Sequence, residues 1–154
     1  MNPKTKQFRH VEHNSSDYWK LVSLRNRLLR VPLGLEFSES ELNGESDHHH
    51  LGIFLDEKVI ACLVLVPLLE NRIKMRQVVV EENFQGLGLG KALVEWSEAF
   101  SLELGFDHML LNARLNAVPF YEKLDYHTMG QEFMEVGIPH YQMQKPLVPQ
   151  SNDL

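Results

Sequence analysis

The stretch Gln85-Gly86-Leu87-Gly88-Leu89-Gly90 constrains this chain more than any other because of what stands on either side of it. The apolar run Val78-Val79-Val80 precedes it, and an amphipathic pattern from Lys91 to Leu104 follows. This order predicts a strand, a glycine-rich loop and a helix. Glycine has no Cβ, so the backbone N–H groups of such a loop can approach an anion at the positive end of the helix macrodipole. The stretch therefore predicts a binding site for a pyrophosphate.

Two better-known phosphate-binding loops do not fit this spacing. The nucleotide P-loop needs a glycine where the chain has Gln85, and a Ser or Thr for magnesium where it has Ala92. The dinucleotide fingerprint G-x-G-x-x-G needs a third glycine where the chain has Lys91 or Leu93. What remains is the pattern Gln-x-x-Gly-x-Gly, formed by Gln85, Gly88 and Gly90.

This pattern resembles the acyl-CoA loop of the GNAT superfamily of N-acetyltransferases, which reads Arg or Gln, two residues, Gly, one residue, and Gly or Ala. The similarity extends from roughly Leu51 to Met143, which is most of the chain. Residues 78–85 resemble the family's fourth strand entering the loop. Residues 116–121 resemble its next helix, with Asn116 near the start and Tyr121 five residues on. Residues 28–35 and 137–140 are similar to a bacterial branch of the family with few assigned substrates.

The resemblance implies an acyltransferase that moves an acetyl group from acetyl-CoA to a primary amine by direct transfer in a ternary complex. A covalent acyl-enzyme is disfavoured because no Cys or Ser stands by the loop with a partnering His. The backbone N–H of Val80, or of Val79, is expected to polarise the thioester carbonyl. The residues expected to bind the carrier are Val78, Val79, Val80, Gln85, Gly86, Leu87, Gly88, Leu89, Gly90, Asn116 and Tyr121.

Tyr121 is the expected general acid, because a phenol with a pKa of about 10 stays protonated at neutral pH and can protonate a departing thiolate. Phe120 and Leu124 lie four residues apart and point one way, so Tyr121, about 100° round the helix, can turn its hydroxyl towards the cleft. A Tyr that only packs on the core is the alternative. Asn116 is expected to cap this helix as well as to contact the carrier.

The general base stays open among Glu81, Glu82, Glu36, Glu135 and His140. A carboxylate or a neutral imidazole could each accept the proton of the amine. His140 follows Pro139 at a break between strands, where it could line the acceptor pocket or lie on the surface. Arg25 and Arg30 could bind a carboxylate or phosphate of the acceptor, or be surface charges of a helix.

The three consecutive histidines His48, His49 and His50 are expected in a solvated loop before the first hairpin strand. Adjacent residues of an extended segment point to opposite sides, so the three cannot all bind one ion. No second His pair or Cys with ligand spacing follows. No metal is therefore expected.

The composition of the chain limits the classes of partner and the compartment that we expect. The 15 Lys and Arg residues against 21 Asp and Glu give a formal charge of −6. No basic stripe is present, so nucleic acid is an unexpected partner. The single Cys62 lies in an apolar run and is expected to be a buried filler in a reducing compartment. Without a signal-peptide core or an apolar segment of membrane-spanning length, we expect a cytoplasmic protein away from membranes.

The 154 residues fit one N-acetyltransferase domain, residues 1–146, with a frayed tail at residues 147–154. Helices are expected from Ser16 or Asp17 to Pro32, from Ser38 to Gly44, after the glycine loop, and after Asn116. Strands are expected at residues 51–55, 59–66, 73–80, 108–114, 127–136 and 141–145.

The implied fold is mixed α/β: a central, mostly antiparallel, twisted sheet that splays between its fourth and fifth strands, with helices on both faces. The exposed final strand could pair with a second copy in a homodimer. The acceptor would be a small-molecule or peptide amine. A non-catalytic acyl-CoA-binding or sensing module is the alternative function, although the retained Tyr121 argues against it. An anion-binding loop on an unrelated fold is a third reading.

Overall fold

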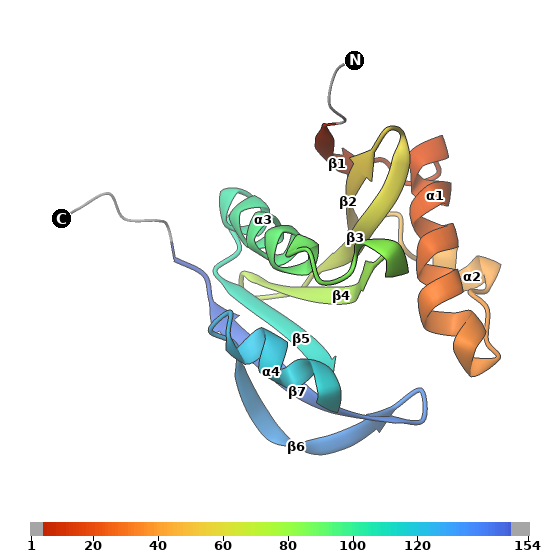
Figure 1. Ribbon diagram of the computed structural model, residues 1–154. Coiled ribbons are helices and arrows are strands. Elements are labelled where there is room, and N and C mark those ends of the chain that lie inside the picture. Colours follow the sequence, from red (N-terminus) through yellow and green to blue (C-terminus); the bar gives the residue numbers. More distant parts are fainter. Residues whose placement is uncertain (1–4, 149–154) are drawn as a thin grey trace. The chain divides into compact units, whose positions relative to one another are not determined.

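The structure is a computed structural model that describes residues 5–148 (Figure 1). Its elements run in the order β1 (Lys6–Val11), α1 (Ser16–Arg25), η1 (Asn26–Arg30), η2 (Val31–Leu33), α2 (Glu39–Asn43), β2 (His49–Leu55), β3 (Lys58–Pro67), β4 (Arg72–Val80), η3 (Glu82–Phe84), α3 (Leu89–Glu103), β5 (His108–Arg114), η4 (Leu115–Ala117), α4 (Val118–Glu122), β6 (His127–Glu135) and β7 (Ile138–Pro146).

Seven strands form one sheet in the order β1-β2-β3-β4-β5-β7-β6. The pairs β1–β2, β2–β3, β5–β7 and β6–β7 are antiparallel, whereas β4 and β5 are parallel from Arg72 opposite His108 to Met75 opposite Leu111. The predicted mixed α/β fold around a mostly antiparallel sheet is confirmed. The splay between β4 and β5 stays a prediction. β1 is absent from the expected strands because all its side chains except that of Val11 are at least partly exposed, so it carries no apolar run.

The chain forms two compact units. The first comprises the residues up to Val66 together with Gln77–Ser97, and the second comprises Pro67–Arg76 with the residues from Glu98 onward. β4 and α3 each run through both units.

Helices cover both faces of the sheet in the first unit (Figure 1). On one face, α1 buries Tyr18 and Leu21 among Phe54 and Cys62. On the other, Phe8 of β1 packs edge-on against Trp96 of α3, with ring centroids 5.1 Å apart. Cys62 is fully buried, as predicted, and burial raises its pKa to about 12.

The caps of the two N-terminal helices follow from local hydrogen bonds. Ser15 caps α1, one residue before the expected positions, by accepting the N–H of Tyr18. Ser38 and Glu41 form the reciprocal capping box of α2, so the predicted start of that helix is confirmed. Between these helices the chain makes a π-helical turn and a 3₁₀ turn, which ends at Gly34 with φ of 72°.

In the second unit, α4 packs on β5 and β6. The same unit holds a polar group: the hydroxyl of Tyr126 donates to Glu98 at 2.7 Å, and the ammonium of Lys145 donates to the same carboxylate at 3.0 Å. Leu147, expected in the frayed tail, is buried, and its N–H donates to the carbonyl of Asp107 at 2.7 Å. Residues 149–154 of that expected tail lie outside the described residues.

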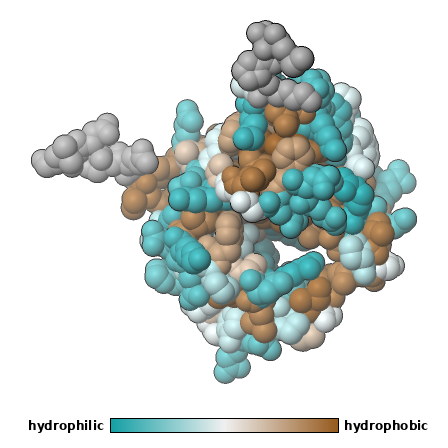
Figure 2. Space-filling model, viewed as in Figure 1, coloured by the Kyte–Doolittle hydropathy of each residue, from teal (hydrophilic) through white to brown (hydrophobic). Residues whose placement is uncertain are grey.

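Within residues 5–148, no helix combines the length and the apolar character needed to cross a bilayer. On the face shown in Figure 2, apolar residues form separate patches interrupted by hydrophilic ones.

Candidate active site

The end of β4 carries a backbone irregularity directly before the residues expected to contact the carrier. Gln77 has φ of 55°, a left-handed conformation that non-glycine residues rarely adopt. Such conformations persist where the surrounding structure imposes them, and they are frequent at functional sites. After it, Val79 is buried while Val78 and Val80 are half-buried.

The glycine loop that follows is open. Gly86 and Gly88 have φ of 80° and 81°, and a Cβ added to either would meet no atom within 4 Å. Glycine is therefore required here by backbone conformation, while the space beside the loop is free. Gln85, which is exposed, donates from Nε2 to the carbonyl of Val80 at 3.0 Å and so ties the loop to the end of β4.

The loop leads directly into α3. The first bond of this helical turn runs from the N–H of Ala92 to the carbonyl of Gly88 at 3.1 Å. The N–H groups of Leu89, Gly90 and Lys91 precede it and have no partner within the helix. Together with the helix dipole, these donors are suited to binding an anion. Residues 85–88 are exposed and Leu89 is buried, so the chain turns towards the core where α3 begins.

The second unit holds Asn116, Tyr121 and His140. Asn116 is exposed in the turn η4, and α4 begins after Ala117, which makes no side-chain cap. The expectation that Asn116 caps this helix is therefore wrong, because a 3₁₀ turn comes between them.

Tyr121 and its neighbour Phe120 differ in burial, and the ring of Tyr121 packs in the interior, as in the alternative expected for it. Tyr121 is 7% exposed, whereas Phe120 is 37% exposed. The ring of Tyr121 packs edge-on against Phe120 and Tyr126, with centroids 5.0 and 5.7 Å apart. Burial raises the pKa of Tyr121 above its ordinary value, so its hydroxyl stays protonated across the neutral range.

His140 lies inside β7 rather than at a break between strands, and it is 4% exposed. Its Nδ1 lies 2.7 Å from the carbonyl oxygen of Ile138. Because a carbonyl oxygen only accepts, Nδ1 carries a proton and Nε2 is the nitrogen free to gain one. Nε2 lies 3.5 Å from Glu135, whose other oxygen accepts from Asn112 at 3.1 Å.

Asn112 is missing from the expected site residues. In the sequence, Asn112 stands out only as a polar amide within the otherwise apolar strand Met109–Ala113. Side chains of a strand alternate between its two faces, so the same pattern fits an ordinary exposed residue.

Glu81, a candidate base, is already engaged. Both oxygens of its carboxylate accept from the guanidinium of Arg27, at 3.0 and 2.8 Å, and the residue is 8% exposed. These hydrogen bonds lower the pKa of Glu81, with burial opposing them. A carboxylate held in this way is a poor proton acceptor. Glu36 and Glu82 are exposed.

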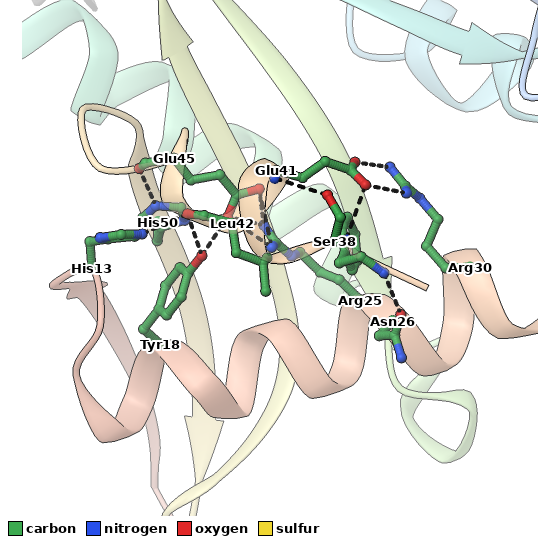
Figure 3. Close-up of polar contacts among 11 residues, drawn as sticks. His13, Tyr18, Arg25, Asn26, Arg30, Ser38, Glu41, Leu42, Glu45 and His50 are labelled. Atoms are coloured by element: carbon green, nitrogen blue, oxygen red, sulfur yellow. Dashed lines mark hydrogen bonds and ion pairs between the residues drawn. The ribbon is translucent and has the colours of Figure 1, made fainter. Parts of the chain in front are cut away.

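The segment before β2 is held against α1 by hydrogen bonds and an ion pair (Figure 3). Arg25 is buried and bonded to Glu45, and Arg30 is bonded to Glu41 at 3.1 Å. Both alternatives for Arg25 are therefore wrong: its guanidinium is neither at the surface nor turned to an acceptor.

The histidine run is also placed differently from the expectation. β2 begins at His49, and His50 is 1% exposed with its Nε2 3.1 Å from the carbonyl of Glu45. The solvated loop is therefore wrong for His49 and His50. Burial is the main cause that lowers the pKa of His50 to about 4. Over residues 5–148, no three His, Cys, Asp or Glu side chains form a metal-binding group.

The family model of the acetyltransferase (GNAT) domain matches residues 36–147. A protein of Bacillus subtilis (strain 168) named as an acetyltransferase is 31% identical over 115 residues, which cover 74% of this chain and 76% of that protein. The N-acetyltransferase YjcF of the same organism is 34% identical over 73 residues, which are 47% of this chain and 52% of that protein.

Solved structures show the same fold. An N-acetyltransferase from Lactobacillus plantarum superposes with a TM-score of 0.82 at 21% identity, covering 96% of this chain and all of that one. An aminoglycoside 6′-N-acetyltransferase complexed with coenzyme A superposes with a TM-score of 0.76 at 14% identity, covering 95% and 99%. With the matched family model and the B. subtilis relative, these findings place the chain in the GNAT family of acetyltransferases, as an enzyme of the N-acetyltransferase class.

Proposed function

We propose that this protein transfers the acetyl group of acetyl-CoA directly to a primary amine within a ternary complex. The observation that carries the proposal is the loop at residues 85–90. It combines two glycines of positive φ, open space at both, and the N–H groups of a helix start, which have no partner within the helix. An anion-binding loop of this form, in a chain of the acetyltransferase family, supports a site for the carrier's pyrophosphate.

The roles of the residues follow from their chemistry. The loop from Gln85 to Gly90 binds the pyrophosphate through backbone N–H groups. The strand at Val78–Val80 binds the pantetheine arm, and the N–H of Val80 polarises the thioester carbonyl. Tyr121 protonates the leaving thiolate, and Asn116 contacts the carrier. His140 lies on the acceptor side.

The acceptor is a small-molecule or peptide amine, and the protein acts in the bacterial cytoplasm, alone or as a homodimer. One structural neighbour is named as an aminoglycoside 6′-N-acetyltransferase and another as a ribosomal-protein-S18-alanine N-acetyltransferase. Aminoglycosides and alanine-terminated peptides are therefore tested as acceptors.

The test uses the whole protein. Calorimetric titration with acetyl-CoA should give saturable binding, and sulfate at the same ionic strength should not raise the melting temperature comparably. Thiol release is then measured with spermidine, L-lysine, kanamycin and an alanine-terminated peptide. Release with one of these supports transfer. Binding without release from any amine supports the sensing module, and absence of binding removes the proposal.

A further inference from the structure

Three polar side chains meet on one face of the sheet in the second unit. Asn112 comes from β5, Glu135 from β6 and His140 from β7, so three separate strands supply them. The amide of Asn112 donates to Oε1 of Glu135 at 3.1 Å, and Oε2 of the same carboxylate lies 3.5 Å from Nε2 of His140. One oxygen of the carboxylate thus accepts from the amide, and the other lies near the imidazole.

Glu135 and His140 differ in their exposure to solvent. The side chain of Glu135 is 45% exposed, whereas that of His140 is 5% exposed. Glu135 can therefore meet a molecule from solvent, and His140 lies behind it. The bond from Nδ1 to the carbonyl of Ile138 holds the imidazole so that Nε2 faces the carboxylate.

The charged surroundings of this pair are mixed. Arg114 of β5 is the register partner of His140, and Phe133 of β6 is its partner on the other side, with ring centroids 6.0 Å apart. From β4, Lys74 interacts electrostatically with both Arg76 and Glu135. Among the charged residues Lys74, Arg76, Arg114 and Glu135, only Glu135 is negative, so an arriving ammonium is attracted to its carboxylate.

We propose that Glu135 and His140 form a proton-accepting pair for the acceptor amine, with Asn112 as the residue that positions Glu135. The proposal rests on the proposed function. The exposed carboxylate binds the acceptor's ammonium, and the imidazole behind it takes up the proton. Glu135 and His140 are catalytic residues in this scheme, and Asn112 is a positioning residue.

The step moves one proton. An N–H bond of the ammonium breaks, its electron pair remains on the amine nitrogen, and the proton forms an O–H bond with Oε2 of Glu135; this O–H bond then breaks as a new N–H bond forms at Nε2 of His140, which leaves Glu135 as a carboxylate. The negative charge of Glu135 balances the resulting imidazolium. The freed electron pair can then attack the thioester carbonyl carbon.

The test measures kcat/KM against pH for the wild type, Glu135→Gln, His140→Gln and Asn112→Ala, using the amine of the panel that gives the fastest thiol release. Glu132→Gln is the matched control, because Glu132 is an exposed carboxylate of the same strand. We expect E135Q and H140Q to lower kcat roughly 100-fold. In E135Q the acid limb of the profile should also move to lower pH, because imidazolium loses its counter-charge. N112A should show the same shift to a smaller extent, and E132Q should match the wild type.

The outcomes separate the two proposals. An active wild type with equal profiles for E135Q and E132Q overturns the pair and leaves the proposed function standing. Absence of acetyl-CoA binding or of thiol release by the wild type overturns both. A measurement independent of activity is the ¹⁵N shift of the His140 ring at high pH: a proton on Nδ1 supports the pair, and a proton on Nε2 overturns it.

Discussion

Arg25 and Glu45 form a buried ion pair in which both terminal nitrogens of the guanidinium reach both oxygens of the carboxylate, at 2.9 to 3.2 Å (Figure 3). Arg25 is 1% exposed and Glu45 is 7% exposed. The hydroxyl of Tyr18 adds a third donor to the carboxylate at 2.7 Å. Because Arg25 and Tyr18 belong to α1, the pair fixes the segment between α2 and β2 to that helix.

Removing one partner of this pair should be costly. Glu45→Gln leaves a buried guanidinium without its counter-charge, and we expect a loss of about 3–5 kcal/mol in the free energy of unfolding, measured by urea titration. The double variant R25M/E45L should regain much of this loss, since it leaves no unpaired charge. Glu41→Gln, at the more exposed pair with Arg30, should cost under about 1 kcal/mol. Equal losses at the two pairs would contradict the burial argument.

Local patterns of the sequence predicted several elements well. The runs that became β2, β3 and β5 are apolar, the capping box at Ser38 is a four-residue pattern, and the glycine loop is contiguous. The polar cluster around Glu45 could not be predicted in this way. Its partners Tyr18 and Arg25 lie 27 and 20 residues away, and no local rule pairs residues at such separations.

The same limit applies to the candidate site. The burial of Tyr121 rather than Phe120 depends on which side of α4 packs against β5 and β6. Helical periodicity alone does not decide which of two adjacent aromatic residues is buried. The partnership of Asn112 with Glu135 spans 23 residues and depends on the order in which β5, β7 and β6 join the sheet.

Protonation of His50 should lower the free energy of unfolding in mild acid. Its pKa is lowered to about 4 in the folded protein, mainly by burial, while an unfolded chain has a value of about 6.5. Between these values the unfolded state binds the additional proton, so the free energy of unfolding decreases as pH falls, by about 3 kcal/mol in total. In His50→Gln this part of the decrease should be absent between pH 6.5 and 5. His127→Gln, at an exposed position, should keep the wild-type profile in urea titrations across that range.

The glycine loop should tolerate no Cβ if it binds the carrier. Gly88→Ala places a side chain at φ of 81° and in the open space beside the loop, so affinity for acetyl-CoA should fall at least about tenfold in calorimetry. Gly105→Ala is the control, because Gly105 has φ of 99° and equally open surroundings at the end of α3. Both variants should lose about 1–2 kcal/mol of stability from backbone strain. Comparable carrier binding by both would remove the loop from the site.

The thiol of Cys62 should not react with alkylating reagents in the folded protein. It is fully buried, and its pKa of about 12 leaves almost no thiolate at pH 8. Iodoacetamide should therefore modify it only after unfolding in guanidinium, as followed by mass spectrometry. Cys62→Ala should keep its thiol-release activity. Fast labelling of the native protein at pH 8 would show that this region opens.

Tyr121→Phe separates the chemical role of the hydroxyl from the packing of the ring. If the hydroxyl protonates the leaving thiolate, kcat should fall roughly 10- to 100-fold while acetyl-CoA affinity changes less than about twofold. The stability change should be small, because the buried ring keeps its contacts with Phe120 and Tyr126. Tyr126→Phe is the complementary control: it removes a hydrogen bond to Glu98, so it should lower stability by about 1 kcal/mol and leave kcat unchanged. Because burial raises the pKa of Tyr121, deprotonation of this group should not lower the wild-type rate up to pH 9.5. A Tyr121→Phe variant with full activity would show that another group protonates the thiolate.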